Sequence, residues 1–95
     1  MQTKDIRVNG KTAKGIEIQM PNAKLILAVA PKGYVICGYL NMETAEKLND
    51  CAAVVTGVKT LDELLEKQVV KVSVSAQNAG IEPGMTGLEA LAKMF

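Results

Sequence analysis

The sequence contains no histidine and no tryptophan, and its only aromatic residues are Tyr34, Tyr39 and Phe95. Without histidine, a single chain has no imidazole metal site and no Ser–His–Asp or Cys–His catalytic set. Three aromatic rings also provide no broad platform on which nucleic-acid bases stack. These absences exclude several common enzyme classes, and we expect neither a metal nor a cofactor.

The chain is also poor in cysteine and has no long apolar run. Cys37 and Cys51 both lie within apolar segments and do not form a disulfide framework. The charge-free segments are too short to span a bilayer, and no charged leader followed by an apolar stretch opens the sequence. We therefore expect a cytoplasmic protein with reduced thiols and no membrane partner.

The 95 residues are 48% hydrophobic and 22% charged, with a formal net charge of +1. These values are typical of one small globular domain rather than a disordered chain. The charges are uneven, because residues 1–40 contain six basic and two acidic side chains while residues 41–95 contain five and eight. We assign the early lysines to turns and exposed strand faces in preference to contact with nucleic acid.

Residues 1–40 have the pattern of an antiparallel meander. Asn9–Gly10 indicates a tight hairpin between a strand near residues 5–8 and a longer second strand. Continuous apolar runs at residues 25–30 and 34–40 predict two more strands, the first of them covered on both sides. Alternation within the second strand predicts one exposed face and one buried face, the latter made of Ile16, Ile18 and Met20.

After residue 40 the apolar period lengthens to that of a helix. Asn41 caps a predicted helix that runs to about residue 49. Strands are expected over residues 53–56 and 70–75, and this strand–helix–strand–helix–strand order predicts right-handed parallel crossovers. Two capping boxes mark further helix starts, Thr60 with Glu63 and Thr86 with Glu89.

These elements together predict a single α+β domain over residues 1–95. An N-terminal antiparallel β meander, with residues 1–30 as its oligomerisation region, runs into βαβ units in residues 31–95. The helices are expected to pack on a mixed sheet.

Cys37 is the candidate catalytic residue. Its thiol is predicted near the end of a strand and just before a helix, whose amino end favours a thiolate. Gly38 beside it permits close approach of a substrate. The base for such a nucleophile must come from a lysine, a carboxylate or another subunit, because the chain has no histidine. The alternative is a packed, unreactive thiol, since cysteine is among the most buried residue types.

Two glycine-containing helix starts are candidate sites for a small-molecule or anionic ligand. Both place backbone N–H groups where they can face an anion, although neither is a phosphate-binding loop. We favour the alternative for both, which is an ordinary turn whose helix cap satisfies those donors. The first comprises Gly57, Lys59 and Thr60, and the second comprises Gly84, Met85, Thr86, Gly87 and Glu89.

Three segments at matching spacing resemble the YunC-like family of bacteria and archaea, a domain of unknown function. They are Tyr34-Val35-Ile36-Cys37-Gly38, Gly57 to Leu65, and Gly80-Ile81 with Gly84 to Leu91. The resemblance implies an N-terminal β region that mediates tetramer formation, and it implies no particular activity. The positions that match the family pattern are Cys37, Gly38, Gly57, Thr60, Gly84, Met85, Gly87 and Glu89.

Two functional hypotheses follow, and binding of nucleic acid by the basic N-terminal half is a third that we favour less. The first is an oligomeric binding or structural module, because a small aliphatic core gains burial from association. The resemblance implies that this oligomer is a tetramer. The second is a small enzyme that uses Cys37 as its nucleophile.

Overall fold

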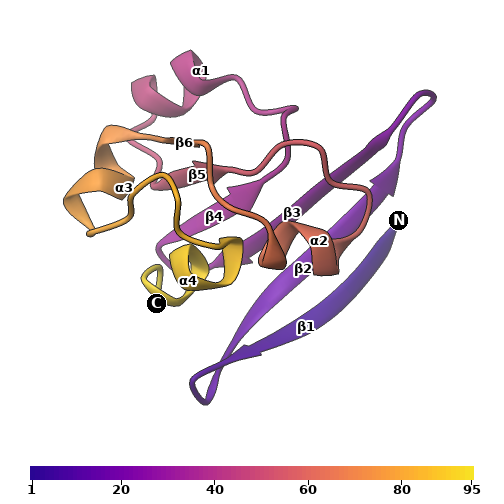
Figure 1. Cartoon of the computed structure of the whole chain (residues 1–95), viewed down its shortest axis with the longest axis horizontal. Helices are drawn as coiled ribbons and strands as arrows, with labels where there is room; N and C mark the ends of the chain where they lie inside the picture. The colour runs from indigo at the N-terminus through magenta and orange to yellow at the C-terminus, as the bar shows by residue number, and fades with distance from the viewer.

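A six-stranded mixed sheet forms the centre of the molecule, and its strands lie in space in their sequence order (Figure 1). The computed structural model describes residues 1–95. Strands β1 to β4 are antiparallel, β4 and β5 are parallel, and β5 and β6 are antiparallel. The strands are β1 Gln2–Val8, β2 Lys11–Gln19, β3 Lys24–Ala30, β4 Gly33–Ile36, β5 Ala52–Val54 and β6 Lys71–Val72.

Four short helices complete the α+β domain and confirm the predicted fold class. Helices α2 and α4 contact each other and pack on β2, β3 and β4, on the near side of the sheet in Figure 1. None of the helices is long and apolar enough to cross a membrane. They are α1 Met42–Lys47, α2 Leu61–Glu66, α3 Val74–Asn78 and α4 Gly87–Ala92.

The first hairpin forms where the sequence predicts it. Asn9 and Gly10 have φ angles of 52° and 81°, so both turn residues adopt the positive φ that a tight type I′ hairpin requires. The register pairs Val8 with Lys11 and continues to Gln2, so β1 is longer than the predicted strand over residues 5–8. The antiparallel meander is thus confirmed.

The predicted buried face of β2 is wrong. Ala13 and Gly15 are buried on the face that meets α2, where the Leu61 side chain lies against Gly15. Because strand side chains alternate, Ile16 and Ile18 lie on the opposite face and are half-buried, and Met20 is 36% exposed.

β3 follows the same division. Ile26, Ala28 and Ala30 are buried beneath the helices, while Leu25 and Leu27 are half-buried and Val29 is 37% exposed. The prediction that this strand is covered on both sides is therefore wrong for the single chain. We call the side of β2 and β3 that points away from α2 and α4 the outer face, made of Ile16, Ile18, Leu25, Leu27 and Val29.

The two predicted crossovers have different outcomes. The β4–α1–β5 connection joins parallel strands, as predicted. The β5–α2–β6 connection returns an antiparallel strand, so its predicted parallel geometry is wrong. The predicted strand over residues 70–75 pairs only at Lys71–Val72, because Ser73 accepts a hydrogen bond from the Ala76 N–H at 3.2 Å and caps α3.

Three predicted helix starts are confirmed, although β4 and α1 are shorter than predicted. Asn41 Oδ1, Thr60 Oγ1 and Thr86 Oγ1 each accept a backbone N–H three residues on. β4 ends at Ile36 rather than at residue 40, and α1 ends at Lys47, which leaves Leu48 66% exposed.

Candidate functional site

Two neighbouring hollows lie where β4 and β5 end. One has a volume of about 330 Å³ and includes Cys37, Gly38 and Gly57 in its lining, and the other has about 450 Å³ and includes Lys59 and Thr60. Because β4 and β5 are parallel, the loops that follow them meet at one edge of the sheet. The hollows share three lining residues, and we call them together the β4–β5 groove: Ala23, Lys24 and Val58.

The structure therefore brings together five of the residues selected from the sequence. Cys37 lies at the buried edge of the groove and is 5% exposed. Its Sγ atom accepts the Ile26 N–H at 3.4 Å and donates to the Lys24 carbonyl oxygen at 3.9 Å. The thiol is thus engaged with the backbone of β3, and this arrangement agrees with the packed interpretation of Cys37.

Glu17 and Lys24 are residues of this groove region that sequence reasoning missed. Glu17 Oε1 lies 3.4 Å from Lys24 Nζ, and Glu17 Oε2 accepts the Leu61 N–H at 2.8 Å at the start of α2. The carboxylate points toward the helices, because Glu17 shares a face of β2 with Gly15. The alternation of side chains along β2 puts Glu17 on the face opposite to Ile16 and Ile18. Because the sequence pattern assigned the isoleucines to the buried face, it assigned Glu17 to the exposed one.

Three backbone donors at the start of α2, the N–H groups of Lys59, Leu61 and Glu63, are already occupied. Lys59 N–H donates to Glu63 Oε1 at 2.8 Å, and Glu63 N–H donates to Thr60 Oγ1 at 3.2 Å. The first of these bonds holds the pKa of Glu63 below its usual value. With Leu61 N–H bound to Glu17, an anion in the groove must rely on side chains rather than on these backbone groups.

The glycine-rich segment from Gly84 to Glu89 lies apart from the groove and lines none of the hollows. Gly84 N–H donates to Val69 O and Gly87 N–H to Lys67 O, both at 2.9 Å. Thr86 N–H donates to Glu89 Oε1 at 2.9 Å in the reciprocal capping box, which lowers the pKa of Glu89. Met85 is half-buried against the core. The geometry fits the structural explanation of this segment.

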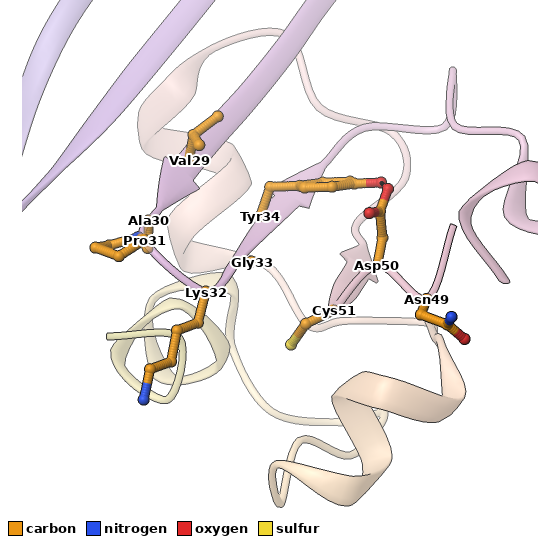
Figure 2. A pocket seen from close by; sticks show the side chains of 9 residues that line it. All are labelled: Val29, Ala30, Pro31, Lys32, Gly33, Tyr34, Asn49, Asp50 and Cys51. Carbon is orange, nitrogen blue, oxygen red and sulfur yellow. Dashed lines mark hydrogen bonds between the residues drawn. The ribbon is translucent and has the colours of Figure 1, made fainter. Parts of the chain in front are cut away.

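A further hollow of about 310 Å³ lies at the β3–β4 turn, and none of the predicted site residues lines it (Figure 2). Figure 2 shows the Tyr34 hydroxyl pointing at the Asp50 carboxylate, and the oxygens are 2.7 Å apart. Burial, together with this hydrogen bond, raises the pKa of Tyr34 to about 12. Burial also raises the pKa of the nearby Cys51 thiol.

No sequence motif could have identified this pair. Tyr34 and Asp50 are 16 positions apart, and their contact depends on the parallel register that sets Tyr34 opposite Ala52. The chain also contains no group of three or more cysteine, aspartate or glutamate side chains arranged to hold a metal ion.

Residues 36–94 match the family model of a domain of unknown function, DUF1805. The chain belongs to this family. Across 95% of its length it is 32% identical to the uncharacterized protein YunC of Bacillus subtilis (strain 168), 93% of which is covered. The DUF1805 match includes Cys37 and strands β5 and β6, and the similarity to YunC extends into the N-terminal meander.

A solved structure also resembles the chain. The protein of unknown function TA1206 from Thermoplasma acidophilum is 41% identical, with a TM-score of 0.94 over 99% of this chain and 92% of its own. The fold described above is therefore shared along almost the whole of this chain and most of the other. The family membership confirms the resemblance inferred from the three sequence segments.

Proposed function

We propose that this DUF1805 protein is a homo-oligomeric binding module that assembles through its N-terminal strands as a tetramer. In this proposal the β4–β5 groove holds a small organic anion. The observation that carries the proposal is the apolar outer face of β2 and β3. The ligand class follows from the side chains around the groove.

The outer face forms one continuous apolar surface. Ile16 pairs with Leu27 and Ile18 pairs with Leu25 across the β2–β3 ladder, so the four side chains are cross-strand neighbours. Val29 extends the same surface and is 37% exposed. Contiguous apolar surfaces of this kind on small proteins are typical of association sites.

A second copy of the chain fits this face because its border carries both signs of charge. Asp5 and Lys14 form an ion pair of 2.6 Å, and Arg7 lies two residues along β1 from Asp5. In a two-fold interface each patch meets its own equivalent, so mixed charges around an apolar centre are self-complementary. The unpaired edge of β1 supplies a further surface for the second contact that a tetramer needs.

The assembly is tested by light scattering coupled to gel filtration. Ile18→Lys places a charge in the outer face and should reduce the particle mass, whereas the matched variant Val74→Lys on the exposed surface of α3 should leave it unchanged. If Ile18→Lys does not fold, Ile18→Thr should still raise the concentration at which subunits associate. A monomeric wild-type chain at micromolar concentration overturns the proposal.

Two lysines give the β4–β5 groove its preference for an anion. Lys59 Nζ makes no ion pair, and Lys24 shares the Glu17 carboxylate with the Leu61 N–H. No carboxylate lines either hollow. Ala23 and Val58 offer an apolar surface between the charges, which suits an organic anion better than a bare inorganic one.

NMR titration with benzoate, and with benzamide as its neutral counterpart, tests the ligand class. Benzoate should shift the amide signals of Gly38 and Lys59, and Lys59→Gln should weaken its binding roughly threefold to fivefold. The matched variant Lys93→Gln, at another exposed lysine, should have no effect. Equal binding of benzamide, or shifts that fall elsewhere, would show that the groove does not select anions.

A nucleophilic Cys37 is the second candidate, because the thiol lines the groove beside Gly38. A side chain at Gly38 meets only Thr56 Cγ2, at 3.7 Å from an added Cβ, so the approach to the groove at this position is open. The rate of alkylation of Cys37 against pH, in a Cys51→Ser background, tests the idea. A thiolate that reacts well below pH 8 supports the nucleophile, and a protected thiol supports packing.

A further inference from the structure

We propose that the hollow beside Tyr34 and Asp50 binds the ammonium group of a small organic amine. This site is separate from the β4–β5 groove and does not depend on the anion site. It borders the outer face, because Val29 belongs both to that face and to the lining of the hollow. Its binding groups are the Asp50 carboxylate and the Tyr34 phenol, which meet in the hollow shown in Figure 2.

The Asp50 carboxylate has no cationic partner. No lysine, arginine or terminal amine lies within 4.0 Å of it, and its one side-chain hydrogen bond comes from the neutral Tyr34 hydroxyl. Lys32 also lines the hollow, but its side chain extends away from the Tyr34–Asp50 pair in Figure 2. The carboxylate therefore leaves an uncompensated negative charge in a half-buried position.

The backbone around Asp50 is held from two sides. Asp50 N–H donates to Ala45 O at 2.9 Å as α1 ends, and Asp50 O accepts the buried Ser73 hydroxyl at 2.6 Å. Asn49 precedes it with φ of 59°, the left-handed conformation that commonly closes a helix. A carboxylate on such a fixed segment is positioned before a ligand arrives, which lowers the entropic cost of binding.

The other walls suit an amine with an apolar body. Val29 and Pro31 line the hollow on the β3 side, and the Tyr34 ring offers a face to a cation. The volume of about 310 Å³ accommodates a small aryl or alkyl amine. An ammonium group that contacts Asp50 donates to the carboxylate, which the phenol hydrogen bond only partly satisfies.

NMR titration with benzylammonium chloride tests the site, with benzyl alcohol as the neutral counterpart. Benzylammonium should shift the amide signals of Gly33, Asp50 and Cys51 and saturate, while benzyl alcohol should not. Asp50→Asn keeps the side-chain size and an acceptor for Tyr34 but removes the charge, so binding should weaken roughly fivefold or more. Glu82→Gln, at an exposed carboxylate elsewhere, is the matched control and should bind as the wild type does.

A second measurement keeps the test decisive if Asp50→Asn does not fold. Tyr34→Phe retains the negative charge of Asp50. It should therefore weaken benzylammonium binding by less than half of the factor expected for Asp50→Asn. Benzylammonium bound in the hollow should also slow alkylation of Cys51 and leave Cys37 unaffected. Equal shifts with benzyl alcohol, or unchanged binding to Asp50→Asn, would overturn the proposal.

Discussion

The two faces of the β2–β3 ladder differ in a way that reverses the usual relation between side-chain size and burial. The face under α2 and α4 contains mainly small residues, Ala13, Gly15, Ala28 and Ala30, together with Ile26. The outer face contains the larger set, Ile16, Ile18, Leu25, Leu27 and Val29. Small residues let the helices approach the sheet closely, and in the proposed assembly the large aliphatic side chains of the outer face contact a second copy of the chain.

The close packing of the helices on the sheet and on each other depends on two glycines. A side chain at Gly15 would overlap the Leu61 side chain of α2, and one at Gly87 would overlap the Leu64 carbonyl oxygen. The first obstacle is the flexible end of a leucine, and the second is backbone. The glycine at position 15 therefore lets α2 pack closely on β2, and the glycine at position 87 lets α4 pack closely on α2.

The largest expected effect comes from truncating Ile26 on the helix side of the sheet, and Ile18 on the outer face is the comparison. Ile26 is fully buried, so Ile26→Ala should lower the free energy of unfolding by about 3 kcal/mol at every protein concentration. Ile18→Ala should cost less than about 1 kcal/mol in dilute subunits, because the side chain is only half-buried there. Its main effect should be weaker assembly.

Urea unfolding at several protein concentrations distinguishes these two results. The urea midpoint of Ile26→Ala should lie below the wild-type midpoint by the same amount at every protein concentration. The difference between the Ile18→Ala and wild-type midpoints should instead grow with protein concentration, because only the wild type gains full stability from association. Equal, concentration-independent losses would show that the two faces do not differ in the proposed way.

Gly87→Ala should have the next largest effect. The added methyl group meets the Leu64 carbonyl, so α4 must move away from α2, and the free energy of unfolding should fall by about 2 kcal/mol. Gly38→Ala is the matched control, since the nearest atom to its added Cβ is 3.7 Å away. Thermal unfolding measures both, and a Gly87→Ala variant as stable as Gly38→Ala would contradict the close packing of the two helices.

Much of the fold follows from local signals in the sequence. The Asn9–Gly10 turn and the helix caps at Asn41, Thr60 and Thr86 depend on a few adjacent residues, and the structure confirms all of them. The face of β2 that meets the helices depends instead on what packs against it. Because Ile16 and Ile18 satisfy a period of two on either face, hydrophobicity alone assigned them to the wrong layer.

The same distinction applies to the candidate sites. Cys37, Gly57 and Lys59 were selected separately, and the parallel pairing of β4 with β5 is what brings them together. Glu17 was missed because its role depends on the face of β2, and Tyr34 with Asp50 was missed because their contact depends on strand register. Residue type indicates chemistry, but only the topology decides which residues meet.

Removing a helix cap should have a smaller effect than either core change. Thr86→Ala deletes the acceptor for the Glu89 N–H and half of the reciprocal box, so the free energy of unfolding should fall by about 1 kcal/mol. Thr44→Ala, at an exposed helical position in α1, is the matched control and should change stability little. Urea unfolding compares the two, and equal losses would mean that the cap contributes nothing specific.

The smallest expected effect concerns the polar border of the outer face, where Tyr34 pairs with Val29. The folded chain raises the pKa of Tyr34 from 10.0 to about 12, chiefly by burial and then through Asp50. Its contribution to stability is therefore fully present below pH 10 and is lost as the pH rises through 12. Because the phenol is partly solvated, this contribution should stay below about 1 kcal/mol.

Ultraviolet absorbance of the phenolate after a rapid pH jump measures this ionisation. In a Tyr39→Phe background Tyr34 is the only tyrosine, so the signal should appear near pH 12. Asp50→Asn removes a negative charge and should move it to lower pH, though not fully to 10.0, because burial remains the larger cause. An unchanged midpoint in Asp50→Asn would show that Asp50 does not act on the phenol. It would also mean that the Asp50 charge does not influence the side of the outer face where Tyr34 lies beside Val29.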